Sequence, residues 1–218
     1  MRLGSTLLVA ALAAATLATL GCMVGEVTHT VYLEPDGSMT WIVEESWMRS
    51  AEDDPRARRS EESEWLAARV GETHAQAEAF WQLGAARVET LVVRDRRPFQ
   101  VVTRATFRNP ADALERLFHA SGLRGEIELA GDRRAGAIAI AIDVEGSQHD
   151  GGNEIGAVGS LLSFDRLRLM VSDGRFVDAV GLELDGDTAW LDERGMERAF
   201  ERDPSTLRLS LAWVHDRR

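Results

Sequence analysis

Short stretches of alternating polar and apolar residues recur along this chain, and neighbouring stretches are joined by residues that form turns. In the first pair, residues 26–47, apolar side chains fall at every second position on both sides of the segment EPDG (34–37). Proline presets the backbone of a turn and glycine accepts a positive φ, so this pattern predicts a β-hairpin. The alternation also places His29 on the apolar side of the first strand.

The same pattern predicts two further hairpins. One covers residues 87–107 with its turn at residues 95–98, and the next turns at Gly131-Asp132. In the second strand of the latter hairpin, isoleucines from Ile138 onward alternate with alanines, so that both sides are apolar and one side is small. Such a strand is typical of a central position in a sheet, and we expect a helix to lie close over the alanine side.

Strands are also predicted in the last third of the chain. They flank turns at Asp173-Gly174 and Asp185-Gly186, and a final strand places four apolar side chains on one side: Leu207, Leu209, Leu211 and Trp213.

Helical periodicity marks the segments between the hairpins. Residues 50–85 contain apolar positions that suit one helical face, and Gly71 is expected to break this helix in two: Trp65, Leu66, Val70, Ala79, Phe80 and Leu83. Gly84 is expected to cap the C-terminal end of this helical segment. A second helix is expected from Asn109 and Pro110 to Gly122, and a short one over residues 192–200.

Together these patterns predict an α+β fold, mostly antiparallel sheet, with about eight or nine strands in hairpins and two or three packed helices. The sequence shows no internal repeat and no low-complexity linker, so residues 22–218 are expected to form a single domain.

An uncharged apolar run, residues 7–20, precedes this domain and stops directly before Gly21 and Cys22. It has the length of the apolar region of a signal peptide and is short for a membrane-spanning helix. Cys22 is the single cysteine of the chain, which excludes an internal disulfide and a cysteine-rich metal site. In an oxidising compartment an unpaired thiol calls for an explanation such as covalent modification.

This segment resembles the signal of bacterial lipoproteins, whose lipobox ends in a small residue followed by cysteine. The resemblance implies that residues 1–21 are removed, that a diacylglycerol is attached to the Cys22 sulfur, and that the new amino terminus is acylated. Ordinary secretion and a retained anchor helix are the alternatives. Because Met23 rather than aspartate follows the cysteine, the outer membrane is favoured over the inner membrane. Residues 23–25 are expected to be a short spacer before the first strand.

A second resemblance concerns the domain itself. The DGS turn (36–38), the LGA step (83–85) and the F-x-N-P entry to a helix (107–110) are similar to LppM-like domains of bacterial envelope lipoproteins, over about residues 22–150. This resemblance implies a cell-envelope domain with a capacity to bind lipid.

Charge excludes one class of partner. The formal net charge is -11, and all 25 cationic residues are arginines. Nucleic-acid binding requires a clustered cationic face, so no nucleic-acid partner is expected. The absence of lysine also excludes a Walker motif, and no G-x-S-x-G elbow is present.

The loop around His149 is the most polar stretch that could perform chemistry. His149 with Asp150 and Glu154 could bind a metal or act in acid–base catalysis, but a glycine-rich polar connection is the favoured interpretation. Asp185-Gly186-Asp187 lacks the spacing of a calcium loop and is interpreted as a turn. No catalytic residue, metal ligand or cofactor is therefore predicted.

Other polar and aromatic residues have structural interpretations. The remaining histidines are dispersed, and satisfied core or edge positions are expected for them: His29, His74, His119 and His215. The charged run of residues 52–64 is interpreted as a solvated helix face. Six tryptophans are expected mostly in the core, with a groove for an apolar ligand as the alternative.

The sequence thus predicts a non-enzymatic, lipid-anchored protein at the periplasmic face of the outer membrane, with a role in binding or assembly. Its partners are expected to be the membrane, through acyl chains on Cys22, and envelope proteins or an apolar ligand. A carrier of lipid or another apolar ligand is the first alternative. A metal-dependent enzyme using the His149 loop is the second.

Overall fold

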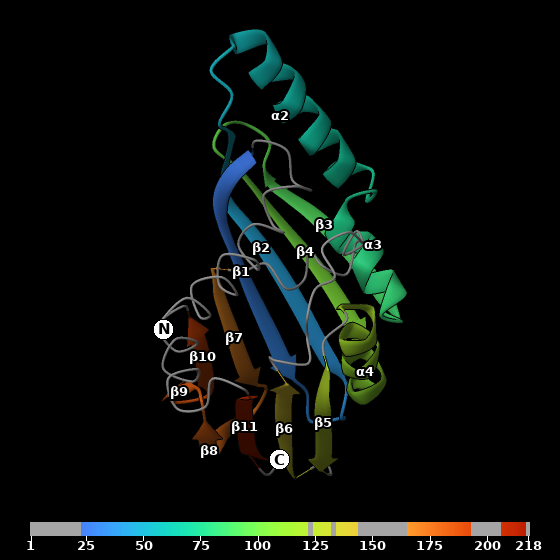
Figure 1. The fold of residues 1–218 in the computed structure, drawn as a ribbon, viewed down its shortest axis with the longest axis vertical. Coiled ribbons are helices and arrows are strands. Elements are labelled where there is room, and N and C mark those ends of the chain that lie inside the picture. Colours follow the sequence, from blue (N-terminus) through green and yellow to red (C-terminus); the bar gives the residue numbers. More distant parts are fainter. Residues whose placement is uncertain (1–22, 122–123, 132–133, 144–164, 193–205, 217–218) are drawn as a thin grey trace, which may run out of the picture.

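Two β-sheets and three helices make up the described part of the chain (Figure 1). The computed structural model describes residues 23–121, 124–131, 134–143, 165–192 and 206–216. The α+β fold class is confirmed. The described residues contain eleven strands, more than the eight or nine predicted, because the segment after residue 165 forms four short strands.

The larger sheet has seven strands in the order β3-β4-β2-β1-β7-β10-β9. Their bounds are β1 Met23–Leu33, β2 Met39–Ser50, β3 Arg87–Arg94, β4 Phe99–Phe107, β7 Arg166–Val171, β9 Glu183–Asp185 and β10 Thr188–Asp192. The predicted hairpins β1–β2 and β3–β4 are confirmed, with their turns at the predicted residues.

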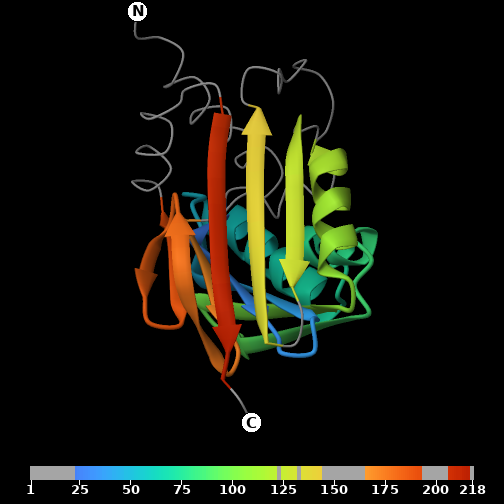
Figure 2. The same ribbon diagram turned by 90° about the horizontal axis from the view of Figure 1, so that it is seen from below.

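The smaller sheet has four strands in the order β5-β6-β11-β8. Their bounds are β5 Arg124–Gly131, β6 Ala135–Asp143, β8 Gly174–Val180 and β11 Thr206–His215. Figure 2 shows this sheet with its strands crossing those of the larger sheet behind it. The predicted β5–β6 hairpin is confirmed, and β6 pairs with β11 on its other side.

One strand pair departs from the prediction of antiparallel hairpins. Residues Thr28–Leu33 of β1 pair in parallel with Arg166–Val171 of β7, so the first strand joins the late part of the chain to the same sheet. Parallel neighbours require a long connection and lie far apart in sequence, so a local pattern marks the strands but not this pairing.

Three helices accompany the sheets: α2 Pro55–Val70, α3 Ala75–Gln82 and α4 Pro110–Ser121. The break at Gly71 is confirmed, since α2 ends there and α3 begins after His74. The Asp54 side chain caps α2 by accepting from the backbone N–H of Arg56 at 3.0 Å. Gly84 follows α3 with a φ of 85°, a conformation in which glycine avoids the Cβ clash.

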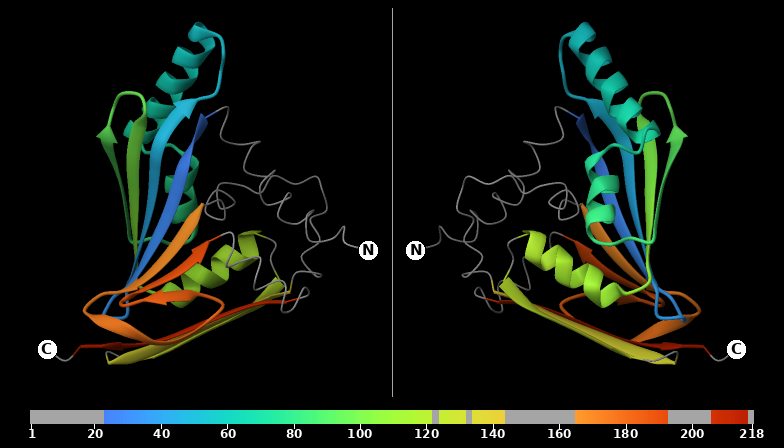
Figure 3. Two further views of the ribbon diagram at one scale, coloured as in Figure 1. Left: turned by 90° about the vertical axis from the view of Figure 1, so that its left-hand side faces the viewer. Right: turned by 90° about the vertical axis from the view of Figure 1, so that its right-hand side faces the viewer.

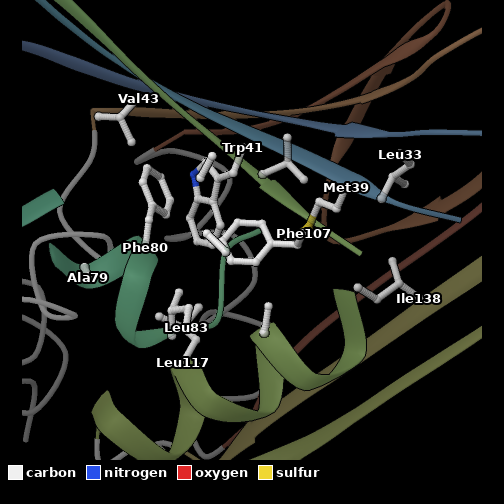
Figure 4. Packing of buried hydrophobic residues seen from close by; sticks show 14 of the residues in the cluster. Leu33, Met39, Trp41, Val43, Ala79, Phe80, Leu83, Phe107, Leu117 and Ile138 are labelled. Carbon is white, nitrogen blue, oxygen red and sulfur yellow. The ribbon is translucent and has the colours of Figure 1, made fainter. Parts of the chain in front are cut away.

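The helices lie on one face of the larger sheet, which we call the inner face; α4 lies between the two sheets (Figure 3). The main core forms there from Trp41, Phe80 and Phe107, whose rings meet edge to face at 5.6 Å and 6.0 Å between centroids (Figure 4). Leu117 of α4 and Ile138 of β6 belong to the same cluster, which therefore spans both sheets.

Two sequence-based expectations about which side chains face the core are wrong. The alanine side of β6 was expected under a helix, but Ala137 and Ala139 are exposed and Ile138 is buried. Both sides of this strand are apolar, and turning the isoleucines inward buries the larger area. Val70 was placed on the buried face of α2, and it is 70% exposed at the last turn.

Substitutions in β6 should distinguish its two sides. Ile138→Ala should lower the free energy of unfolding by about 2–5 kcal/mol, because it leaves a cavity between the sheets. Ala139→Ser, on the exposed side of the same strand, should change it by no more than about 0.5 kcal/mol. Urea denaturation of the purified variants measures both values, and equal losses would contradict the assigned orientation.

Candidate functional site

The first described residue of the chain lies at one end of the larger sheet. Met23 pairs with Ser50 at the end of β2, and its side chain is only 7% exposed. It packs in a second apolar cluster with Met48, Trp65, Phe99 and Val101. The spacer predicted at residues 23–25 is therefore wrong, because β1 begins at Met23. Cys22 itself lies outside the described residues.

A β-bulge follows at this end, opposite Gly25. The pairing of β2 shifts between Glu45 and Met48, and Trp47 within the shift has a φ of 58° and is 63% exposed. A Cβ on Gly25 would lie 2.7 Å from the Ser46 carbonyl oxygen and closer still to the Met48 sulfur. Gly25 thus allows β1 to approach the bulge, and the bulge turns the Trp47 side chain away from the core.

A buried ion pair lies beneath the bulge, on the inner face. The Arg69 guanidinium of α2 donates to both carboxylate oxygens of Glu45, from Nη2 at 2.6 Å and from Nε at 3.2 Å. The side chains are 6% and 2% exposed, and the guanidinium also lies 4.0 Å from the centre of the Trp65 ring. A bidentate pair with a stacked ring fixes the position of α2 against β2.

A histidine network continues this cluster toward α3. His74 Nδ1 lies 3.1 Å from Gln76 Oε1, and Nε2 lies 3.0 Å from the Thr90 hydroxyl. Burial lowers the pKa of His74, and the nearby Arg69 charge adds to this effect. The backbone N–H of Ala77 also donates to Nδ1 at 3.4 Å, so the imidazole caps the start of α3.

The role of Glu45, Arg69 and His74 depends on whether a ligand could reach them from the surface. Two of the hollows on the described surface have volumes of about 430 Å³ and 180 Å³. Neither is lined by Glu45, Arg69 or His74. Because Glu45, Arg69 and His74 are all buried, we assign this cluster to holding α2 and α3 on the sheet.

His29 occupies the predicted apolar side of β1 and is fully buried. The indole N–H of Trp41 donates to its Nδ1 at 3.2 Å. Burial lowers the pKa of His29 from 6.5 to about 3, so this imidazole is neutral in the folded protein at neutral pH.

Two of the remaining candidates from the sequence fall wholly or mostly in segments that the structure does not describe. The His149 loop lies outside the described residues, as do residues 193–200 of the predicted last helix, whose first residue, Asp192, ends β10. Asp185-Gly186-Asp187 forms the predicted turn between β9 and β10. Within the described ranges, no three His, Cys, Asp or Glu side chains are grouped closely enough to hold a metal ion.

The tryptophans divide between core and surface. Trp41, Trp65 and Trp213 are buried, as expected for most of them, whereas Trp47 and Trp81 are 63% and 51% exposed. Trp190 lies under the guanidinium groups of Arg166 and Arg168, at 5.6 Å and 5.4 Å. None of the helices in the described ranges has the length and hydropathy needed to span a membrane.

The sequence contains a signal for the features that pattern reasoning missed. Alternation in β2 fails at Glu44-Glu45, after which Met48 is buried out of phase, and such a slip indicates a bulge. Arg69 stands four residues after Trp65, so the helical period places it on the same, buried face of α2.

Comparisons with known proteins add one finding. No protein-family model matches the chain, and no curated protein matches it. One solved NMR structure is similar with a TM-score of 0.39 and 7% identity, covering 92% of this chain and 94% of that chain. It is the folded domain of the LppM protein of Mycobacterium tuberculosis. At this level of likeness, fold and function rest on the chain's own residues.

Loss of the buried Arg69–Glu45 ion pair should strongly destabilise the fold. Arg69→Ala leaves the Glu45 carboxylate buried without its partner and should lower the free energy of unfolding by about 3–5 kcal/mol. The control is Arg87→Ala, which removes an exposed pair with Glu89 at 2.5 Å and should cost about 0–1 kcal/mol. Chemical denaturation of both variants measures these values. A loss for Arg69→Ala no larger than the control would overturn the assigned role.

Acidification should destabilise the fold through His29. Its pKa is lower in the folded than in the unfolded chain, so the unfolded state gains the proton first as the pH falls below about 6.5. Between pH 7 and pH 5 this linkage should remove about 2 kcal/mol of stability, from about 1.4 kcal/mol per pH unit below the unfolded pKa.

His29→Asn tests this linkage because it keeps an acceptor for the Trp41 indole and does not titrate. Its free energy of unfolding should fall less between pH 7 and pH 5 than that of the wild type, as measured by urea denaturation at each pH. His119→Asn, at an exposed position on α4, is the matched control and should retain the wild-type dependence. An unchanged pH dependence in His29→Asn would refute the linkage.

Proposed function

We propose that this chain is a lipid-anchored cell-envelope protein, attached through acyl chains on Cys22, whose domain has a binding or assembly role at the membrane. The observation that carries the proposal is the start of β1. Met23, directly after the proposed acylation site, is already paired with Ser50 and buried in an apolar cluster. A lipid on residue 22 would therefore hold the folded domain against the bilayer without an intervening linker.

The physics of attachment favours a multiply acylated terminus. A single acyl chain binds a membrane marginally, at about 0.8 kcal/mol per buried CH₂, whereas two or three chains hold stably. Removal of residues 1–21 takes Arg2 from a chain of net charge -11 and leaves the body of the protein at -12. Anionic lipid repels this body, so the acyl chains must supply the attachment. The residue after Cys22 is methionine, which supports a place at the periplasmic face of the outer membrane.

Carriage of an apolar ligand is not favoured by any observation in the described ranges. The larger of the two hollows is lined by Glu34, Pro35, Asp36, Ser38, Thr40, Arg104 and Thr106. Most of these side chains are polar, whereas pockets for apolar ligands are lined mostly by hydrophobic and aromatic side chains. The anchored binding or assembly role therefore stands as the proposal.

Mass spectrometry of the full chain expressed in a bacterium tests the anchor. The mature amino-terminal peptide should begin at Cys22 and carry the mass of a diacylglyceryl group with a further acyl group. Cys22→Ser should remove these masses and abolish membrane association. Met23→Leu, which changes the neighbouring residue and keeps the cysteine, is the control and should remain acylated. A wild-type protein that stays in the membrane fraction with a free Cys22 thiol would refute the proposal.

A further inference from the structure

Exposed apolar side chains gather at the end of the larger sheet where β1 begins. Four exposed residues of β1, β2 and β3 contribute: Val24 (40%), Trp47 (63%), Leu91 (64%) and Val93 (51%). Arg49, which pairs with Val24 in the sheet, and Arg94, which lines one hollow together with Trp47, are exposed beside them. We call these six residues the Trp47 surface.

Helices α2 and α3 do not cover this surface, because they pack on the inner face (Figure 3). The strand register places Leu91 opposite Val102, and Arg94 opposite Gln100, away from the buried side chains of Val101 and Phe99. The surface thus belongs to the outer face and to the edge strand β3.

The backbone conformation at Trp47 indicates that the fold specifically exposes this side chain. A residue other than glycine in the left-handed region costs about 1–2 kcal/mol, and an exposed indole forgoes the gain from burial. Gly25 has to lack a side chain for the bulge to fit. An observed backbone outlier that aims a large amphipathic side chain outward is a reason to look for what covers it.

Charged residues of both signs lie at this end, and the arginines among them differ in their partners. Arg97 pairs with Glu62 at 3.4 Å. Glu44 already accepts hydrogen bonds from Ser46 and Gln100 at 2.8 Å. Arg49, Arg94 and Arg96 form no ion pair with other residues in the described ranges.

The position of the proposed anchor favours the lipid bilayer as the partner of the Trp47 surface. The amino-terminal segment outside the described residues ends at residue 22, so acyl chains on Cys22 would start two residues before Val24. Strand β1 runs alongside the bulge that bears Trp47. Indole rings prefer the boundary between lipid headgroups and acyl chains, and guanidinium groups form bidentate hydrogen bonds with phosphate.

We propose that the Trp47 surface docks on the lipid bilayer, with Trp47 at the headgroup–acyl boundary and Arg49 and Arg94 on lipid phosphates. This inference rests on the proposed lipid anchor and adds an orientation to it. The outer face of the larger sheet, at the end where β1 begins (the upper end of the sheet in Figure 1), faces the membrane.

Quenching by lipid tests the docking directly. The full-chain lipoprotein is purified from membranes and reconstituted into vesicles of phosphatidylethanolamine and phosphatidylglycerol with brominated acyl chains, which quench tryptophan on contact. The wild-type emission should be quenched, and Trp47→Phe should remove more than half of that quenching. Trp81→Phe, on the exposed side of α3, is the matched control and should retain it. Equal quenching in both variants, or none in the wild type, overturns the docking.

A labelled thiol separates failure of docking from failure of the anchor. With Cys22 acylated, Trp47→Cys provides the one free thiol of the mature chain, and Trp81→Cys provides the control position. A polarity-sensitive fluorophore at residue 47 should emit at shorter wavelength in vesicles and be quenched by spin-labelled lipids, whereas the same label at residue 81 should not.

Every other result of the labelling experiment refutes either the anchor or the docking. A wild-type protein that takes up the label on Cys22 refutes the anchor. An acylated protein whose label at residue 47 stays in water refutes the docking alone. A wavelength shift that vanishes when the protein is diluted with excess lipid assigns the surface to a second copy of the chain, which also overturns the docking.

Discussion

Backbone pairing of β1 is the constraint on which the rest of the structure depends. The strand is hydrogen-bonded to β2 on one side and, in parallel, to β7 on the other, so it connects the first hairpin to the late strands of the chain. Its inward side chains, among them His29 and Val31, form part of the main core. This pairing begins at Met23, the residue directly after Cys22 in the sequence.

Much of this architecture could be predicted from local pattern. Alternation and turn residues predicted β1–β2, β3–β4 and β5–β6, and Gly71 predicted the break between α2 and α3. The partners of distant strands could not be predicted, because the β1–β7 pairing leaves no mark in either strand. Which side of β6 faces the core could not be predicted either, because isoleucine and alanine are both apolar. The isoleucines face inward because their burial removes the larger apolar area from water.

The candidate site was less accessible to prediction, and for a different reason. Glu45 and Arg69 are charged residues that pattern reasoning assigns to the surface, and only their mutual pairing makes burial tolerable. Trp47 fits an apolar pattern, yet the bulge opposite Gly25 turns it outward. Cys22 stands apart, because its proposed role comes from the signal-like sequence before it, while the structure contributes the buried start of β1 directly after it.

The central claim is that the folded domain begins at the bilayer, without a tether. Neutron reflectometry on the reconstituted full-chain lipoprotein, in lipid monolayers at several water contrasts, measures the protein density as a function of height above the headgroups. The account predicts protein density that starts within the headgroup layer, with no hydrated gap below it. A water-filled layer between the headgroups and the domain would contradict the account.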